Sequence, residues 1–192
     1  MIRIVSGSAG GRRLGTPTGA GTRPTSDRVR EALFSRLDHL DVLSGARVLD
    51  LYAGSGALAF EAMSRGAAHA LLVESDRGAG AVARRNAQTL GWSAVAEIRV
   101  ETVEKVLLGG PSHPVDLVFL DPPYDLPDDR LGDVLALLVG HRWLAPDALV
   151  VVERSSRGPQ PAWPVGLAEA GERRYGETKV WFADAPGPDE VA

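Results

Sequence analysis

The sequence contains no cysteine, which excludes disulfide bridges and zinc sites built from thiolates. It also lacks a signal-like leader and any run of about 18 apolar residues, so we expect a cytoplasmic protein without membrane association. Histidine is scarce. The four copies are far apart and form no metal-binding pattern, so no metal is expected: His39, His69, His113 and His141.

The residues that are present suit a single folded domain. The chain has 192 residues with 44% hydrophobic content, enough for one core and short for a two-domain oxidoreductase. Strand patterns alternate with helix patterns, which predicts a doubly wound α/β sheet. We expect strands at 47–51, 69–74, 95–100, 115–120 and 148–153, helices near 57–65, 77–90, 102–108 and 128–139, and a C-terminal antiparallel hairpin at 167–174 and 178–183.

The stretch from Asp121 to Tyr124, Asp-Pro-Pro-Tyr, directly follows the apolar run 115–120. It lies where open α/β sheets bind ligands, at the carboxyl end of a strand. The Asp121 carboxylate and a proline carbonyl can accept the two N–H bonds of an exocyclic amine, while Tyr124 offers a ring for stacking. The stretch therefore predicts a site for a planar, amine-bearing group; the alternative is a Pro-Pro turn that only closes the strand.

A second candidate site starts at Asp50, where an apolar strand runs into a turn with Gly54 and Gly56 and then a helix. Glycines there let the backbone approach a ligand and expose N–H groups at the helix start. The turn also fits the dinucleotide pattern G-x-G-x-x-A. Asp50 favours a ligand with a sulfonium and an ammonium group over a pyrophosphate, and Glu74, at the next strand end, can accept ribose hydroxyls.

Positive charge is concentrated at the N-terminal end. Residues 1–36 hold seven arginines against Asp27 and Glu31, a balance of +5, which leaves −9 for the rest of a chain of net charge −4. A local positive face is what phosphate binding requires, although a solvated helix and terminus would have the same composition.

The same segment predicts a hairpin from strands at 2–6 and 12–14 and then an amphipathic helix. Thr25 or Ser26 is expected to cap the helix, with Val29, Leu33, Leu37 and Leu40 on its apolar face. Because the catalytic sheet is predicted to begin near Arg47, truncation before Thr16 is expected to leave a folded protein.

Two function classes from outside this combination of sites stay open. A nicotinamide-dependent oxidoreductase would use the glycine turn but would leave Asp-Pro-Pro-Tyr without a role. A non-catalytic RNA-binding module would explain the basic segment, but it would not require acids at three strand ends.

Taken together, the glycine turn, Glu74 and Asp-Pro-Pro-Tyr at successive strand ends resemble the S-adenosylmethionine-dependent amino-methyltransferases over residues 46–154. The flanks at 10–12, 23–34 and 174–178 are similar to the RsmD family, bacterial 16S ribosomal RNA guanine-N2 methyltransferases. The similarity then extends over residues 2–182.

The resemblance implies a Rossmann-like class I methyltransferase fold: a mostly parallel seven-stranded sheet, an antiparallel C-terminal hairpin and an N-terminal β-hairpin arm. It implies an RNA-binding arm at 1–24, a catalytic domain at 25–184 and a disordered tail at 185–192. The implied reaction moves a methyl group from S-adenosylmethionine to the exocyclic N2 of a guanine in 16S ribosomal RNA, free or in the small ribosomal subunit, with the enzyme as a monomer. Methylation of adenine N6, cytosine N4 or a protein glutamine amide would use much the same chemistry.

The resemblance also assigns site residues. The catalytic set is Asp121, Pro122 and Tyr124. The cofactor set is Asp50, Tyr52, Gly54, Gly56, Glu74, Thr102 and Val103. Thr102 stands where many relatives carry an acid, so a hydroxyl and backbone amides would have to recognise the adenine ring. The substrate RNA set is Arg12, Arg13, Arg23, Thr25 and Arg28.

Overall fold

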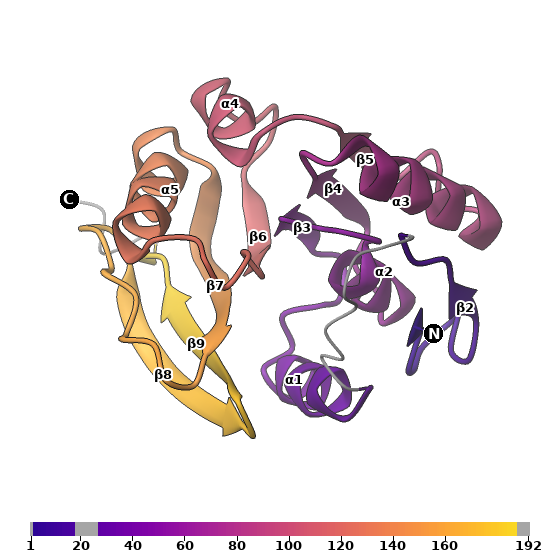
Figure 1. Ribbon diagram of the computed structural model, residues 1–192, viewed down its shortest axis with the longest axis horizontal. Coiled ribbons are helices and arrows are strands. Elements are labelled where there is room, and N and C mark those ends of the chain that lie inside the picture. Colours follow the sequence, from indigo (N-terminus) through magenta and orange to yellow (C-terminus); the bar gives the residue numbers. More distant parts are fainter. Residues whose placement is uncertain (1, 18–26, 188–192) are drawn as a thin grey trace.

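The computed structural model describes residues 2–17 and 27–187. Its central feature is a seven-stranded sheet (Figure 1). The sheet strands are β3 (Arg47–Leu51), β4 (His69–Val73), β5 (Ala96–Arg99), β6 (Val115–Leu120), β7 (Leu144–Ser155), β8 (Ala168–Tyr175) and β9 (Thr178–Asp184). Their spatial order is β5-β4-β3-β6-β7-β9-β8.

The strands from β5 to β7 pair in parallel, and β9 pairs antiparallel with β7 on one side and β8 on the other. A helix precedes each parallel strand after β3, because a parallel pair needs a crossover connection. The β8–β9 connection turns at Gly176, which has a φ of 62°. The predicted fold, a class I methyltransferase sheet that ends in an antiparallel hairpin, is confirmed.

Helices cover both faces of the sheet (Figure 1). Helices α1 (Asp27–His39), α2 (Ala57–Ser64) and α3 (Arg77–Leu90) enclose one apolar core, and α4 (Val103–Leu108) and α5 (Asp128–Gly140) enclose the other. On α1, Leu33 and Leu37 are buried as predicted. The prediction for Leu40 was wrong, since α1 ends at His39 and Leu40 is 43% exposed; Phe34 is buried instead, against Phe119.

The N-terminal segment forms a hairpin of β1 (Ile2–Arg3) and β2 (Arg13–Leu14), paired antiparallel. It is packed onto the domain rather than standing apart, because Ile4, Ala9 and Leu14 are buried in the core beneath α1, α2 and α3.

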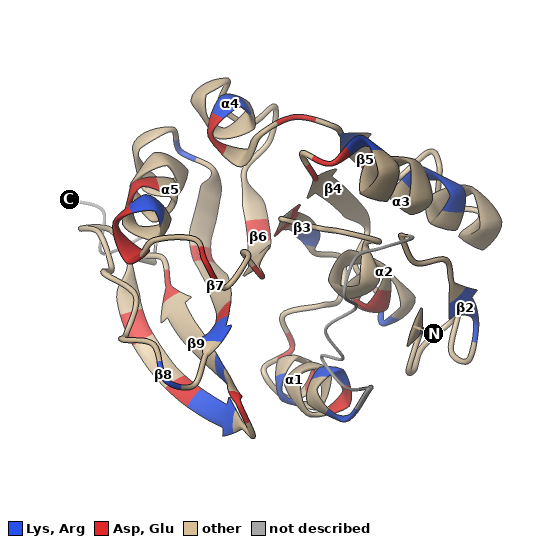
Figure 2. Cartoon of the chain, viewed as in Figure 1, with Lys and Arg blue, Asp and Glu red and all other residues tan. Residues whose placement is uncertain are grey.

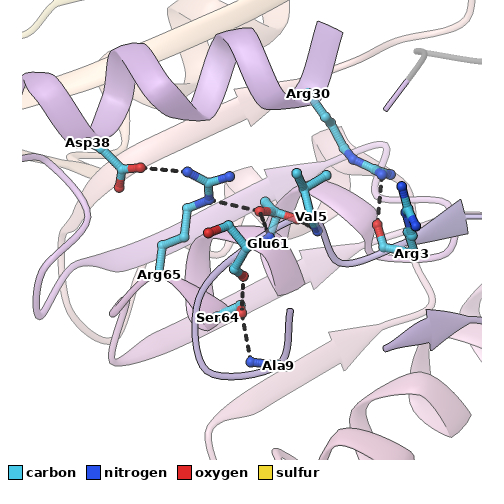
Figure 3. A network of polar contacts seen from close by, with 9 residues as sticks. Arg3, Val5, Ala9, Arg30, Asp38, Glu61, Ser64 and Arg65 are labelled. Carbon is cyan, nitrogen blue, oxygen red and sulfur yellow. Dashed lines mark hydrogen bonds and ion pairs between the residues drawn. The ribbon is translucent and has the colours of Figure 1, made fainter. Parts of the chain in front are cut away.

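A buried carboxylate fixes this hairpin segment to α2 (Figure 3). Glu61 is fully buried and accepts hydrogen bonds from the N–H groups of Val5 (2.6 Å) and Ser6 (3.1 Å). Arg65 neutralises it, with 2.8 Å between Nε and Oε1, and also pairs with Asp38 of α1. Without the N-terminal segment, the Glu61 carboxylate would lose two of these donors.

Because the N-terminal segment is packed into the core, its removal should destabilise the protein. Deletion of residues 1–15 is now expected to destabilise the protein by at least about 3 kcal/mol, because it exposes the apolar surface that Ile4 and Leu14 cover. Chemical denaturation of the truncated and full-length chains measures the difference.

The matched control is the full-length Arg12→Gln, Arg13→Gln double variant, which removes two of the hairpin charges and keeps the buried apolar residues in place. It should unfold close to the wild type. A truncated chain as stable as the full-length protein would restore the expectation drawn from the sequence.

At the other end, Ala185 is buried and its N–H donates to the Ala148 carbonyl at 2.8 Å. The packed chain thus extends past the predicted boundary at 184, because one more residue pairs with the start of the buried part of β7. Residues 188–192 of the predicted tail lie outside the described residues.

Candidate active site

Four acidic side chains meet at the carboxyl ends of neighbouring strands. Asp50 of β3, Glu74 after β4, Asp121 after β6 and Glu153 of β7 all line one cavity of about 380 Å³. Arg30 of α1 lines the same cavity. Sequence reasoning had placed the first three at strand ends, and the parallel sheet brings them together because all these strands end at one edge.

The turn between β3 and α2 is unusual in its backbone. Tyr52, Gly54 and Gly56 have φ values of 64°, 55° and 84°. A Cβ at Gly56 would lie 2.4 Å from a ring carbon of Phe60 and 2.6 Å from a methyl of Leu72, so only glycine fits there. Tyr52 holds the left-handed conformation without that freedom, which costs of order 1–3 kcal/mol and is typical of functional turns.

Glu74 holds this turn in place. Its Oε2 accepts from the Gly54 N–H and its Oε1 from the Asp76 N–H, both at 2.8 Å. A carboxylate has about four acceptor positions, so Glu74 can bind these two donors and still accept hydroxyl groups from the cavity.

Asp50 is a buried acid of the cavity. It is 1% exposed, and its Oδ2 accepts from the Ala59 N–H in the first turn of α2 at 3.1 Å. Burial raises the pKa of Asp50 to about 8; the Ala59 hydrogen bond opposes the shift, and the charges of Asp121 and Glu74 add to it. This carboxylate therefore ionises less readily than an exposed one, mainly because it is buried and to a smaller extent because two carboxylates lie near it.

This charge distribution favours one of two cofactor classes. A dinucleotide would bring its pyrophosphate to the start of α2, yet the Asp50 carboxylate already binds an N–H there. A ligand with positive charge is favoured instead, because it would offset the acids that line the cavity. The sulfonium and ammonium groups of S-adenosylmethionine fit this requirement.

Two residues of the Asp-Pro-Pro-Tyr stretch form the part of the cavity wall that follows β6. Asp121 and Pro123 line the cavity, Pro122 is buried, and Tyr124 is 45% exposed. Pro122 and Tyr124 are not among the described residues that line the cavity, so their predicted contacts with an amine-bearing base stay predictions.

A family model described as "Conserved hypothetical protein 95" matches residues 2–184. The chain belongs to this family. A relative named "Ribosomal RNA small subunit methyltransferase D", from Escherichia coli (strain K12), is 37% identical over 193 residues, with 100% of this chain and 94% of the relative covered. A protein of the same name from Haemophilus influenzae is 36% identical over 160 residues, with 82% and 81% covered.

Among solved structures, "Putative methyltransferase yhhF from Escherichia coli" superposes with a TM-score of 0.83 and 35% identity, covering 97% of this chain and 98% of that one. These similarities confirm the predicted RsmD family.

Other residues that the RsmD resemblance assigned lie outside the cavity wall. Thr102 caps α4, where its hydroxyl accepts from the Lys105 N–H at 3.4 Å, and Val103 is 4% exposed in the core. Neither is among the described residues that line the cavity. Their predicted contact with the cofactor stays a prediction.

The structure describes three of the five residues that the RsmD resemblance assigned to RNA binding. Arg12 and Arg13 are exposed on the hairpin, and Arg28 is exposed on α1. Arg23 and Thr25 lie outside the described residues.

Sequence reasoning missed two charged residues of the cavity wall. Glu153 is 4% exposed and could have been found, since the predicted strand 148–153 ends at this acid. Arg30 is 3% exposed, and its Nη2 donates to the Arg3 carbonyl at 2.7 Å (Figure 3). Its position had no sequence signal, because it depends on how α1 packs beside the sheet.

Membrane spans and metal clusters are both absent from residues 2–17 and 27–187. In this part of the chain, no helix is long and apolar enough to cross a membrane, and no group of three His, Asp or Glu side chains could hold a metal ion.

Proposed function

We propose that this protein transfers a methyl group from S-adenosylmethionine to the exocyclic N2 of a guanine in the 16S RNA of the small ribosomal subunit. The observation that carries the proposal is the meeting of Asp50, Glu74 and Asp121 in one cavity. The first two acids suit the two ends of the cofactor, and the third suits an amine. The protein is proposed to act as a monomer in the cytoplasm.

Asp50 faces the cationic methionine end of the cofactor in this proposal. Gly54 and Gly56 let the backbone approach its middle, and Glu74 accepts the ribose hydroxyls. Tyr52, from the same turn, forms part of the cavity wall. The bound cofactor supplies a methyl carbon that is electrophilic because it is bonded to a sulfonium sulfur.

The protein's part in the reaction is orientation. The lone pair of a guanine amine is delocalised into the ring, so it does not point at an electrophile by itself. Asp121 and the Pro122 carbonyl accept the two N–H bonds, and Tyr124 stacks on the base, which directs the lone pair at the methyl carbon. Methyl transfer would leave the cofactor as S-adenosylhomocysteine, and the proton lost by the nitrogen would pass to the Asp121 carboxylate or to solvent. A paired base hides its amine, so the target guanine must be unpaired or flipped out.

The experiment that tests the function is nucleoside mass spectrometry of 16S RNA from cells that lack the protein. We expect one N2-methylguanosine to disappear and to return with the wild-type chain but not with Asp121→Ala. Loss of N6-methyladenosine instead would name adenine as the target base, and an unchanged nucleoside profile would reject the function.

The proposed RNA surface begins at the hairpin and continues over α3 (Figure 2). The hairpin contacts α3 through a hydrogen bond from the Gly15 N–H to Asn86 Oδ1, at 2.8 Å. The Arg12 guanidinium donates to the Thr89 carbonyl. Helix α3 has no acidic residue and carries three exposed arginines: Arg77, Arg84 and Arg85.

The Arg12→Gln, Arg13→Gln double variant is expected to bind RNA more weakly and with a smaller salt dependence. The slope of log affinity against log salt should flatten by about 0.7 for each RNA phosphate that the variant no longer neutralises. Filter binding at several salt concentrations measures the slope.

The matched control is Lys105→Gln, Arg142→Gln, which removes the same charge from the α4 and α5 side of the sheet. It should leave the slope unchanged, and cofactor affinity should be unchanged in both double variants. Equal slopes in all three proteins would reject the hairpin as an RNA-binding element.

A further inference from the structure

The loop that carries Asp-Pro-Pro-Tyr is rich in proline. It spans residues 121–127, from the end of β6 to the start of α5, and includes Pro122, Pro123 and Pro127. Proline has no N–H, so these positions cannot donate backbone hydrogen bonds. Within the loop, the Leu126 N–H donates to the Pro123 carbonyl at 3.0 Å. A donor from another element can in addition fix the loop relative to the cavity.

Arg154 supplies such donors from the neighbouring strand β7. Its Nη2 donates to the Leu126 carbonyl at 2.9 Å and to Asp128 Oδ1 at 2.8 Å, and its Nη1 makes a longer contact of 3.4 Å with the Pro123 carbonyl. A single guanidinium thus connects the middle of the loop, its end and the first residue of α5. The planar fork of five N–H donors makes this possible, and a lysine ammonium could not span the same acceptors.

The backbone that carries Arg154 is held within the sheet. Arg154 is 7% exposed and lies in β7, where it pairs with Lys179 of β9 inside the sheet. The residue before it, Glu153, lines the cavity. The end of β7 therefore presents one side chain to the cavity wall and the next to the loop, since successive side chains of a strand point to opposite faces.

We propose that Arg154 is a positioning residue for methyl transfer: by holding the loop at Pro123 and Leu126, it sets where Asp121 and the Pro122 carbonyl meet the substrate amine. The inference rests on the proposed function. Displacing a reacting group by about 1 Å can cost on the order of 10²-fold in rate, so a loop that is only loosely held should slow the chemical step. The cofactor contacts proposed for β3 and β4 should be unaffected.

The test compares Arg154→Met, Arg154→Lys and Asp128→Ala with the wild type. Asp128→Ala removes one of the three contacts at a side chain that is 53% exposed, so it should fold normally even if the buried variants are less stable. The measurements are kcat and KM on 16S RNA, S-adenosylmethionine affinity by calorimetry, and hydrogen exchange of the peptide containing Tyr124 and Leu126. The control is Arg157→Met, which removes an arginine that is 85% exposed and pairs with Glu177.

Arg154→Met is expected to lower kcat by about 10- to 100-fold, with cofactor affinity within about twofold of the wild type. Arg154→Lys and Asp128→Ala should give smaller losses, and loop exchange should quicken in the same order. The Arg157→Met control should match the wild type in kcat and exchange. Folded Arg154 variants with wild-type kcat and loop exchange would overturn the proposal, as would a loss of cofactor affinity as large as the loss of kcat.

If the wild type methylates no RNA, the proposed function fails. The exchange measurement then still decides whether Arg154 holds the loop: faster exchange supports that contact, and unchanged exchange rejects it.

Discussion

Replacing Asp121 with alanine should lower the rate of methyl transfer by about 10²-fold or more and leave cofactor affinity nearly unchanged. The carboxylate lines the cavity from the end of β6, one strand away from the glycine turn that is proposed to hold the cofactor. Its loss removes one of two acceptors for the amine and leaves the cofactor acceptors in place. Single-turnover kinetics with 16S RNA and calorimetry with S-adenosylmethionine separate the two effects.

Glu74→Ala is the contrasting variant. It should weaken cofactor binding by about 1–3 kcal/mol, because a charge-assisted acceptor is lost, and excess cofactor should restore its turnover. The Gly54 and Asp76 N–H groups also lose their acceptor in this variant, so part of the effect comes from a less ordered turn.

For the Asp121→Ala variant, near-normal turnover would contradict the prediction and remove Asp121 from the mechanism.

The fold could be predicted from the sequence because local and long-range signals agree. Mostly apolar runs such as 115–120 indicate strands that are largely buried on both faces, and the intervening amphipathic segments indicate crossover helices. The order of the last two strands had no such signal. Strand β9 enters between β7 and β8, and that choice depends on tertiary packing rather than on any residue pattern.

The sequence predicted the site residues that stand at the carboxyl ends of predicted strands, because open α/β sheets bind ligands there. Asp50, Glu74 and Asp121 were found in this way, and Glu153 obeys the same rule. Arg30 and Arg154 could not be found, because an arginine in a helix or strand pattern gives no indication of which loop or cavity its long side chain will reach.

The N-terminal hairpin shows a different limit. Its glycines and arginines predicted a separate arm, and the apolar residues between them are too few to indicate a core contribution. Ile4 and Leu14 are nevertheless buried, and the partner that fixes the segment is Glu61, which lies 56 positions after Val5 in the sequence. Sequence periodicity carries no information about a contact between residues so far apart.

Asp50 combines a cost in stability with a role in binding. Its pKa in the folded protein, about 8, lies above the ordinary value of 3.8, so the folded state holds a proton that the unfolded state releases between these values. Stability of the unliganded protein should therefore decrease as pH rises from about 4 to 8, at up to about 1.4 kcal/mol per pH unit. A cation bound beside Asp50 would favour the ionised form, so cofactor affinity should rise with pH up to about 8.

The Asp50→Asn variant is accordingly expected to be more stable than the wild type by about 2 kcal/mol or more at pH 8 without cofactor. The asparagine oxygen can still accept from the Ala59 N–H, and it never ionises. The same variant should bind S-adenosylmethionine more weakly, by about 1.5–3 kcal/mol, because the charged acceptor is gone.

Denaturant unfolding at pH 5 and pH 8 measures the effect on stability. Calorimetry in two buffers of different ionisation enthalpy measures the effect on binding, together with the proton that the wild type should release on binding at pH 7. A destabilised variant at pH 8, or wild-type binding without proton release, would show that Asp50 is ionised before the cofactor arrives.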